Sequence, residues 1–330
     1  MKKIKLKLST ILLIIAIAAF VIIIPNTNKG YSMMVMNVAL IYSIATYGIS
    51  VMFGLGGHLA FSAVTFMGVG AYTIANLCSG RLGFIINTAY AFLIAIVSGA
   101  VLSFIIGLLL LRLKGTYFSF ATIGLVQVSW SIYQNYKPLS GGPDGIPNIS
   151  TLQIFGWSPD SYNEWFYVLV VVVLIVAILV ERIRKSQLGR SLSAIRDNEI
   201  AAYTLGINVY MTKVFAFTIA GILATVAGAL YAMHGKYVSA EMFTFECATS
   251  YIIMAMLGGV NDTCGIFLCS FLVTMLPEWL RSMKDYLQLL YGIGIVLLMV
   301  FMPDGLAGLA KRIVKKIRHN AAKKNAGKDV

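Results

Sequence analysis

The sequence predicts an all-α polytopic membrane protein with about ten transmembrane helices and with both termini in the cytosol. Hydrophobic residues make up 59% of the 330 positions, charged residues make up only 12%, and the mean hydropathy is +0.84. Apolar runs near the ~20 residues of a membrane-crossing helix recur along the chain. In lipid, backbone N–H and C=O groups can form hydrogen bonds only within a helix or between the strands of a closed barrel. Apolar runs of this length favour helices.

Ten segments share this apolar character. They run from about residues 10 to 25, 33 to 53, 59 to 79, 86 to 111, 116 to 133, 166 to 180, 214 to 233, 247 to 260, 264 to 277 and 286 to 302. The first follows four lysines but ends at Pro25-Asn26 without a small-residue cleavage pattern, so we expect an uncleaved anchor. The eighth and ninth are short, and a re-entrant pair is the alternative to two crossings. Five plus five crossings would also allow inverted repeats, which the faint similarity between the halves leaves open.

The basic residues test the orientation. With a cytosolic N-terminus, 20 of the 26 Lys and Arg residues fall in inside segments and six fall outside, as the positive-inside rule predicts. This bias also accounts for the net charge of +13 without a nucleic-acid partner. The sequence thus divides into a transmembrane domain over residues 1–310, which contains a large cytosolic loop at 181–213, and a basic cytosolic tail at 311–330.

Several functional classes find no support. The four cysteines form no CxxC pair and the three histidines are scattered, so we expect no metal site. No G-x-x-x-x-G-K-[ST] motif, paired intramembrane carboxylate or nucleophile–base pair occurs, so we expect neither ATP hydrolysis by this chain nor another enzymatic activity. All 13 Asp and Glu residues lie in loops, tails or segment ends, which weakens an ion-coupled carrier without excluding it.

The loop at 181–213 contains a short predicted helix. Asp197 or Asn198 is suited to the N-cap, Glu199 adds a negative charge to the first turn, and Gly206 can adopt the left-handed conformation that ends a helix. The helix would span residues 200–205, and its small Ala201 and Ala202 would permit another surface to approach closely. An ordinary amphipathic helix lying against the membrane is the alternative.

The segment from 116 to 133 is the most polar of the ten. Ser119, Thr122 and Ser129 fall close to one helical face, while Gln127 is turned away. These four residues are the candidates for lining a path for a polar solute. The competing interpretation is that they form hydrogen bonds between helices.

Two groups of motifs resemble a known family. The run Glu-Ile-Ala-Ala-Tyr-Thr-Leu-Gly at 199–206 resembles the EAA-type motif of ATP-binding cassette (ABC) importer permeases. The sequence around it, together with Gly-rich 54–72, 112–122, 140–145, 257–259 and 303–306, resembles the branched-chain amino acid permease family, in its LivM-like branch. Asn261 stands where this family is expected to have a small Gly. The resemblance spans roughly residues 35 to 310.

This resemblance implies a multi-pass permease subunit of a bacterial or archaeal cell (inner) membrane. It implies partners: a second related permease, two cytosolic ATP-binding subunits that use the ATP, and an extracytoplasmic solute-binding protein delivering leucine, isoleucine, valine or similar amino acids. The chain itself would bind no cofactor. The residues implied in coupling to the ATP-binding subunits are Arg196, Glu199, Ala201, Ala202 and Gly206. The alternatives are an ion-coupled secondary amino acid transporter and an ABC permease for urea or short amides.

Overall fold

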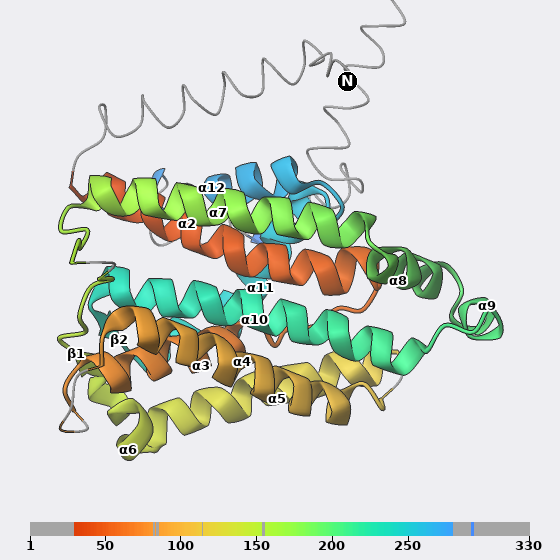
Figure 1. Cartoon of the computed structure of the whole chain (residues 1–330), viewed down its shortest axis with the longest axis horizontal. Helices are drawn as coiled ribbons and strands as arrows, with labels where there is room; N and C mark the ends of the chain where they lie inside the picture. Colours follow the sequence, from red (N-terminus) through yellow and green to blue (C-terminus); the bar gives the residue numbers. More distant parts are fainter. Residues whose placement is uncertain are drawn as a thin grey trace, which may run out of the picture.

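The computed structural model describes residues 30–81, 83, 86–113, 115–153, 156–279 and 292–293, and statements about the structure concern these residues. Helices dominate this part of the chain (Figure 1). In chain order the elements are α2 (Tyr31–Ile49), the π-helix η1 (Ser50–Leu55), α3 (Ala63–Cys78), α4 (Thr88–Leu110), α5 (Thr116–Asn135), α6 (Lys137–Ser140), the 3₁₀-helix η2 (Gly142–Asp144), β1 (Ile146–Pro147), α7 (Tyr162–Lys185), α8 (Gln187–Asp197), α9 (Glu199–Thr204), α10 (Val209–Gly235), β2 (Tyr237–Val238), the 3₁₀-helix η3 (Ala240–Phe243), α11 (Phe245–Gly258) and α12 (Thr263–Trp279).

Eight of the ten predicted apolar segments coincide with helices in the described part of the chain. Four of these helices are long and apolar enough to cross a membrane: α2 continued by η1, then α4, α7 and α10. The helix α5 has 20 residues but a more polar composition, and α3, α11 and α12 are shorter. At 14 residues, α11 is about 21 Å long, less than the ~30 Å of a bilayer core. The first and tenth predicted segments lie outside the described residues, apart from residues 292–293.

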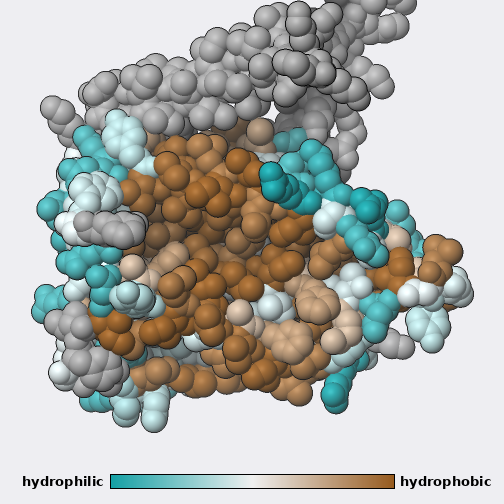
Figure 2. All heavy atoms as spheres, viewed as in Figure 1, coloured by the Kyte–Doolittle hydropathy of each residue, from teal (hydrophilic) through white to brown (hydrophobic). Residues whose placement is uncertain are grey.

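The long helices fall into an inner and an outer group. Most residues of α2 and α10 are buried inside the bundle, whereas α4 and α7 are buried along one narrow stripe. The sequence of α4 is apolar on every side, so the face that it does not bury remains hydrophobic. Figure 2 shows the result, an apolar belt between two hydrophilic ends. A bilayer is the solvent for which such a surface is suited.

The two ends of the bundle carry different structures (Figure 1). At one end, here the β end, α6 and η2 lead into β1, which pairs antiparallel with β2 through Ile146 and Val238. The chain turns tightly at 140–145, where Gly141, Gly142 and Gly145 all have positive φ. At the opposite end, here the α9 end, α8 and α9 connect α7 to α10.

Glycines bring α10 against α3. A Cβ added to Gly228 would lie 1.8 Å from the carbonyl oxygen of Met67, and one added to Gly70 would lie 2.1 Å from that of Thr225. Membrane helices associate through such close backbone packing, since lipid supplies no hydrophobic drive between them. The α3–α10 contact is therefore set by backbone atoms that cannot yield easily.

We expect Gly228→Val to destabilise the purified protein in detergent by about 3 kcal/mol or more, since the new atoms meet backbone rather than a flexible side chain. The measurement is the thermal unfolding midpoint. The matched control is Gly235→Ala in the same helix, where an added Cβ meets nothing within 4 Å. Equal midpoints for the two variants would contradict this account of the packing.

Candidate functional site: the α9 end and the outer face of α5

The local sequence positions α8 and α9. Ser186 caps α8 by accepting from the backbone N–H of Gly189 (3.4 Å), and α8 then buries Leu192 and Ile195. Asn198 is the N-cap of α9, because its Oδ1 accepts from the N–H groups of Ile200 and Ala201, both at 3.0 Å. The sequence left Asp197 and Asn198 as alternatives, and the structure selects Asn198.

The helix α9 begins one residue before the predicted helix and is followed by Gly206, which has the expected left-handed conformation with φ +81°. Six residues are too few for a stable isolated helix. Two contacts tie α9 to the residues on its C-terminal side: Glu199 Oε2 accepts from Lys213 Nζ on α10 at 2.8 Å, and Ile207 N–H donates to the Ala202 carbonyl at 3.1 Å. The Lys213 side chain is only 10% exposed. The helix is thus held firmly against α10.

The exposed surface of α9 is apolar. Ile200, Tyr203 and Leu205 are exposed by 78%, 73% and 79%. Figure 1 shows that α9 projects from the bundle at the α9 end. We call these three residues the α9 tip. Large apolar side chains gathered on a projecting helix mark a site of association.

The two alanines do not share this surface. Ala201 is exposed, but Ala202 is only 1% exposed and faces the bundle. Ala201 is therefore open to the approach of another surface, whereas Ala202 packs within the chain. One sequence feature could have identified the α9 tip: large apolar residues, Ile200, Tyr203 and Leu205, lie on both sides of the alanine pair within a charged loop.

Arg196 also points away from the α9 tip. Its Nη1 donates to the carbonyl oxygen of Gly54, 142 residues earlier in the chain, at 2.7 Å. A Cβ on Gly57 would lie 2.7 Å from Arg196 Cγ, so the side chain crosses the backbone at a glycine. Of the five predicted coupling residues, Ala201 is exposed on α9 and Glu199 is partly exposed, whereas Ala202 and Arg196 hold the element in place.

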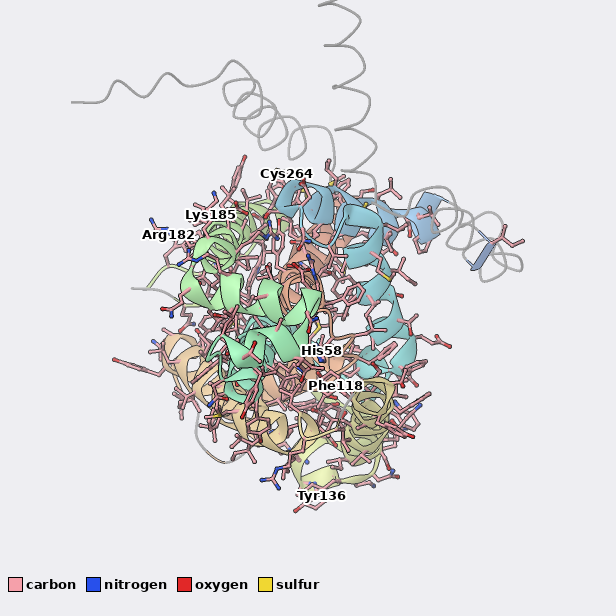
Figure 3. The ribbon with its side chains drawn as sticks, turned by 90° about the vertical axis from the view of Figure 1, so that its right-hand side faces the viewer. His58, Phe118, Tyr136, Arg182, Lys185 and Cys264 are labelled. Carbon is pink, nitrogen blue, oxygen red and sulfur yellow. The ribbon has the colours of Figure 1, made fainter. Side chains whose placement is uncertain are left out.

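The residues between η1 and α3 form a break in the helical structure, here the unwound segment (residues 56–62). His58 lies in it, donates from Nδ1 to the Gly56 carbonyl (2.6 Å) and sets its ring edge against Phe118 at the start of α5, with 6.0 Å between centroids (Figure 3). Burial lowers the pKa of His58 below its ordinary value. The ring is therefore neutral at pH 7, and it forms a packing contact between the unwound segment and the start of α5.

Three serine and threonine hydroxyl groups of α5 point into the bundle. Ser119 Oγ donates to the Leu59 carbonyl (2.9 Å), Thr122 Oγ1 accepts from the Phe61 N–H (3.2 Å), and Ser129 Oγ lies 2.8 Å from Thr65 Oγ1. Gln127 is exposed on the opposite face. The four residues predicted to line a path are thus not brought together. Three bond other segments of this chain, as in the competing interpretation, and Gln127 faces outward as its helical position predicts.

The outer face of α5 differs from the other exposed helix faces. The exposed residues of α4, and those of α7 before its basic end, are all apolar or tyrosine. The exposed residues of α5 mix apolar and polar side chains with a glycine. They are Thr116, Tyr117, Phe120, Gly124, Gln127, Val128, Ser131, Ile132 and Asn135. An exposed amide near the middle of this 20-residue helix would be costly against lipid, so this face fits a polar path or a protein neighbour.

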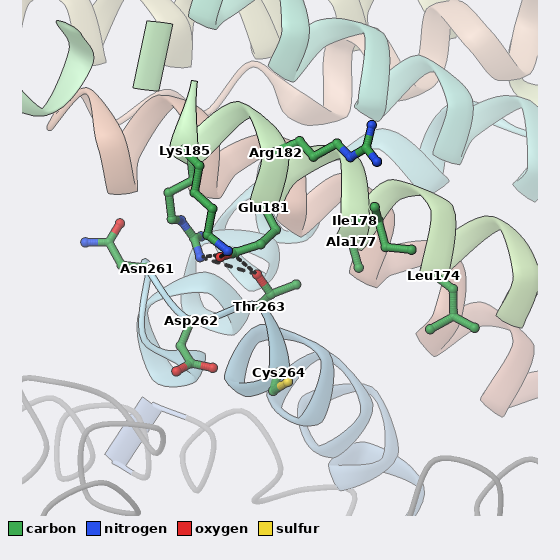
Figure 4. Close-up of a pocket in the computed structure, with 11 residues that line it drawn as sticks. Leu174, Ala177, Ile178, Glu181, Arg182, Lys185, Asn261, Asp262, Thr263 and Cys264 are labelled. Carbon is green, nitrogen blue, oxygen red and sulfur yellow. Dashed lines mark hydrogen bonds and ion pairs between the residues drawn. The ribbon is translucent and has the colours of Figure 1, made fainter. Parts of the chain in front are cut away.

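An open cavity of about 560 Å³ lies between the end of α7 and the start of α12 (Figure 4). On its wall Glu181 accepts from Arg184 Nη1 (2.9 Å) and Lys185 Nζ (3.0 Å), and Thr263 Oγ1 lies 3.4 Å from the same carboxylate. The first two bonds lie within α7, whereas Thr263, which also accepts from Arg184 Nη1 at 3.3 Å, links α7 to the start of α12. No three His, Cys, Asp or Glu side chains lie together as metal ligands in the part of the chain described.

Comparison with known proteins identifies the class. Residues 31–303 match the family described as branched-chain amino acid transport system / permease component. The chain belongs to this family of transport permeases, so the resemblance seen in the sequence is confirmed. Membership does not favour the alternative of an ion-coupled carrier.

Several relatives share most of the chain. The high-affinity branched-chain amino acid transport system permease protein LivM of Escherichia coli K12 is 29% identical over 94% of this chain and 78% of its own length. LivM of Salmonella typhimurium LT2 is 30% identical over 92% and 75%. The autoinducer 2 import system permease protein LsrC of Enterobacter sp. 638 is 27% identical over 70% and 68%. No solved structure matches the chain significantly.

We expect Asn198→Ala to loosen α9, because it removes the acceptor for two N–H groups, a cap with a typical value of about 1 kcal/mol. Hydrogen exchange at the Ile200 and Ala201 amides should accelerate roughly fivefold, while exchange within α10 stays unchanged. Asn198→Asp keeps the acceptor oxygen and should exchange like the wild type. Equal exchange in the Ala and Asp variants would show that the cap does not stabilise α9.

Proposed function

We propose that this chain is the membrane-spanning permease subunit of an ABC importer for branched-chain or related hydrophobic amino acids. The observation that carries the proposal is family membership over residues 31–303, joined to an apolar tip that projects from the predicted cytosolic loop. The relatives named as branched-chain amino acid permeases align over more of this chain than the autoinducer 2 permease does, which supports an amino acid as substrate.

The proposed assembly follows from the family and from the charge distribution. The chain crosses the cell (inner) membrane of a bacterium or archaeon about ten times, with both termini and the α9 end in the cytosol. It pairs with a second, related permease, and two cytosolic ATP-binding subunits supply the energy, since this sequence contains no Walker-type motif. An extracytoplasmic binding protein delivers the amino acid at the β end.

The α9 tip is the proposed docking surface for an ATP-binding subunit. Ile200, Tyr203 and Leu205 leave a large apolar area exposed on a helix that the cap and the Glu199–Lys213 bond fix in place. A groove with apolar walls on the partner could bury these side chains. Because α9 is already fixed in place, binding would cost little conformational entropy. ATP binding then changes how the partner grips α9, and this differential grip shifts the permease between outward and inward access.

The outer face of α5 is the proposed wall of the translocation path. Gln127 and Ser131 offer hydrogen bonds to the charged groups of a zwitterionic solute, and Phe120 and Val128 offer apolar contact to its side chain. The second permease closes the path from the other side. Ser119, Thr122 and Ser129 hold α5 in position rather than touching the solute.

Ile200→Asp and Leu205→Asp are expected to abolish copurification of the ATP-binding subunits, because a carboxylate would be buried without a partner. The permease itself should remain monodisperse in size-exclusion chromatography, since both side chains are exposed. Leu205→Met keeps the apolar surface and serves as the control. Ala202→Arg is a poorer test, because this buried position would disrupt α9 itself. Retention of the ATP-binding subunits by both Asp variants would overturn the docking assignment.

Gln127→Leu should lower uptake of leucine by the complete importer in proteoliposomes by roughly tenfold, the effect of losing one hydrogen bond of about 1.4 kcal/mol to a charged group. Association with the ATP-binding subunits should persist. Leu109→Ala, on the exposed face of α4, is the control and should transport normally. Normal uptake by Gln127→Leu would remove α5 from the path, and absence of amino acid uptake by the wild-type assembly would refute the proposed function as a whole.

A further inference from the structure

Side-chain bonds join the α9 end to η1 at Gly54, and the unwound segment that follows η1 is bonded to α5. The bond to Gly54 comes from Arg196, near the C-terminal end of α8 and two residues before the N-cap of α9. Its Nη1 donates to the Gly54 carbonyl at 2.7 Å. Turned so that its oxygen faces the guanidinium, the Asn261 amide accepts from Arg196 at 3.2 Å and donates to the same Gly54 carbonyl at 3.1 Å. Three segments far apart in sequence thus meet at one carbonyl group.

The backbone at residues 54–57 is open to close contact from α8. Residues 50–55 form a π-helix rather than an α-helix, a geometry found mostly as local bulges and frequently at functional sites. Gly57, at φ +70°, has no side chain, and Arg196 occupies the space that a Cβ would need. Leu192 packs one turn earlier, with its Cδ2 3.5 Å from the Cβ position of Gly56. A displacement of α8 would therefore push directly on residues 54–57.

The unwound segment is bonded to α5 on its other side. The Leu59 carbonyl accepts from Ser119, the Phe61 N–H donates to Thr122, and His58 packs edge-on against Phe118. All three contacts lie within the first two turns of α5. Since α5 is a regular helix, a shift of its first turns carries along the face that holds Gln127.

We propose that Arg196 transmits the movement of α8 and α9 to α5 through the unwound segment, with Ser119 and Thr122 as the receiving contacts. Arg196 is then a positioning residue: it touches neither the solute nor the ATP-binding subunit. Asn261 completes its grip and adds the loop before α12 to the moving group. This inference rests on the proposed function, because it assigns the route by which docking at the α9 tip would reach the path.

The test uses the complete importer with its ATP-binding subunits and binding protein in proteoliposomes. For Arg196→Gln we expect the ATP-binding subunits to copurify as in the wild type, while the amino acid imported per ATP hydrolysed falls about fivefold or more. Arg196→Lys keeps one donor and should recover part of this ratio. The matched control is Arg190→Gln on the same helix, whose guanidinium bonds the Lys185 carbonyl (2.7 Å) and not the unwound segment. Control transport should be normal.

A double-variant cycle separates transmission from general stabilisation. Thr122→Val removes the acceptor for Phe61 N–H and should lower the same ratio. If both bonds serve one route, Arg196→Gln combined with Thr122→Val should lose little more than Arg196→Gln alone. Fully additive losses would overturn the proposal. Arg196→Lys and Thr122→Val keep it testable if Arg196→Gln fails to fold.

A conformational readout gives a further check. In a cysteine-free background, Val128→Cys reports on the outer face of α5, where Val128 is 59% exposed. Its labelling by a membrane-impermeant maleimide should differ between nucleotide-free and ATP-trapped complexes, and Arg196→Gln should remove that difference. Loss of the ATP-binding subunits from Arg196→Gln would instead make Arg196 a docking residue and refute the relay. Failure of the wild-type assembly to import amino acids would refute the proposed function, an outcome distinct from either result.

Discussion

The architecture depends on satisfying the backbone polar groups of one interrupted stretch of helix. Lipid and a packed helical bundle give exposed N–H and C=O groups no solvent partner, so an interruption must be bonded by other segments. Here the interruption runs from η1 through the unwound segment, and Gly54, Leu59 and Phe61 each obtain a side-chain partner from a distant helix. Arg196, Ser119 and Thr122 are those partners. Because each bond joins segments 60 to 142 residues apart, the interruption also fixes how α8 and α5 lie relative to the inner helix α2.

This constraint decides which polar groups remain for a solute. Three hydroxyls of α5 are engaged within the chain, and displacing them would leave buried groups unpaired. The polar groups that remain on α5 lie on its outer face. By contrast, the exposed residues of α4, and those of α7 before its basic end, are apolar or tyrosine. In the proposed importer, a single subunit would therefore present one wall of the polar path on its surface. This explains why a second permease is a structural requirement of the proposal and why α5 falls below the hydropathy of the other long helices.

Much of the helical structure could be predicted from the local sequence. Apolar length located eight helices, and the N-cap, the first-turn carboxylate and the left-handed glycine located α9 to within one residue. The direction in which Ala202 faces was not predictable, because six residues are too few to show a helical period and the Glu199–Lys213 and Ile207–Ala202 contacts decide it. The bond from Arg196 to Gly54 spans 142 residues and leaves no local trace. Asn261 was a visible clue, since it stands where a small residue was expected and its amide bonds both Gly54 and Arg196.

The contacts of the α9 end are of two kinds: polar bonds that hold α9 to the rest of the chain, and an exposed apolar surface. The helix is short, but Asn198 caps it and the nearly buried Lys213 joins it to α10. Arg196, just before this cap, bonds the Gly54 carbonyl. The α9 tip is exposed in the described part of the chain, and it is apolar. A partner that buries the tip gains affinity from apolar area, yet it can move the permease only through the contacts behind the tip. The proposal therefore assigns affinity for the ATP-binding subunit and transmission of its movement to different residues. Ile200, Tyr203 and Leu205 would provide the affinity, and Arg196 would transmit the movement. A variant of one group should leave the property of the other intact.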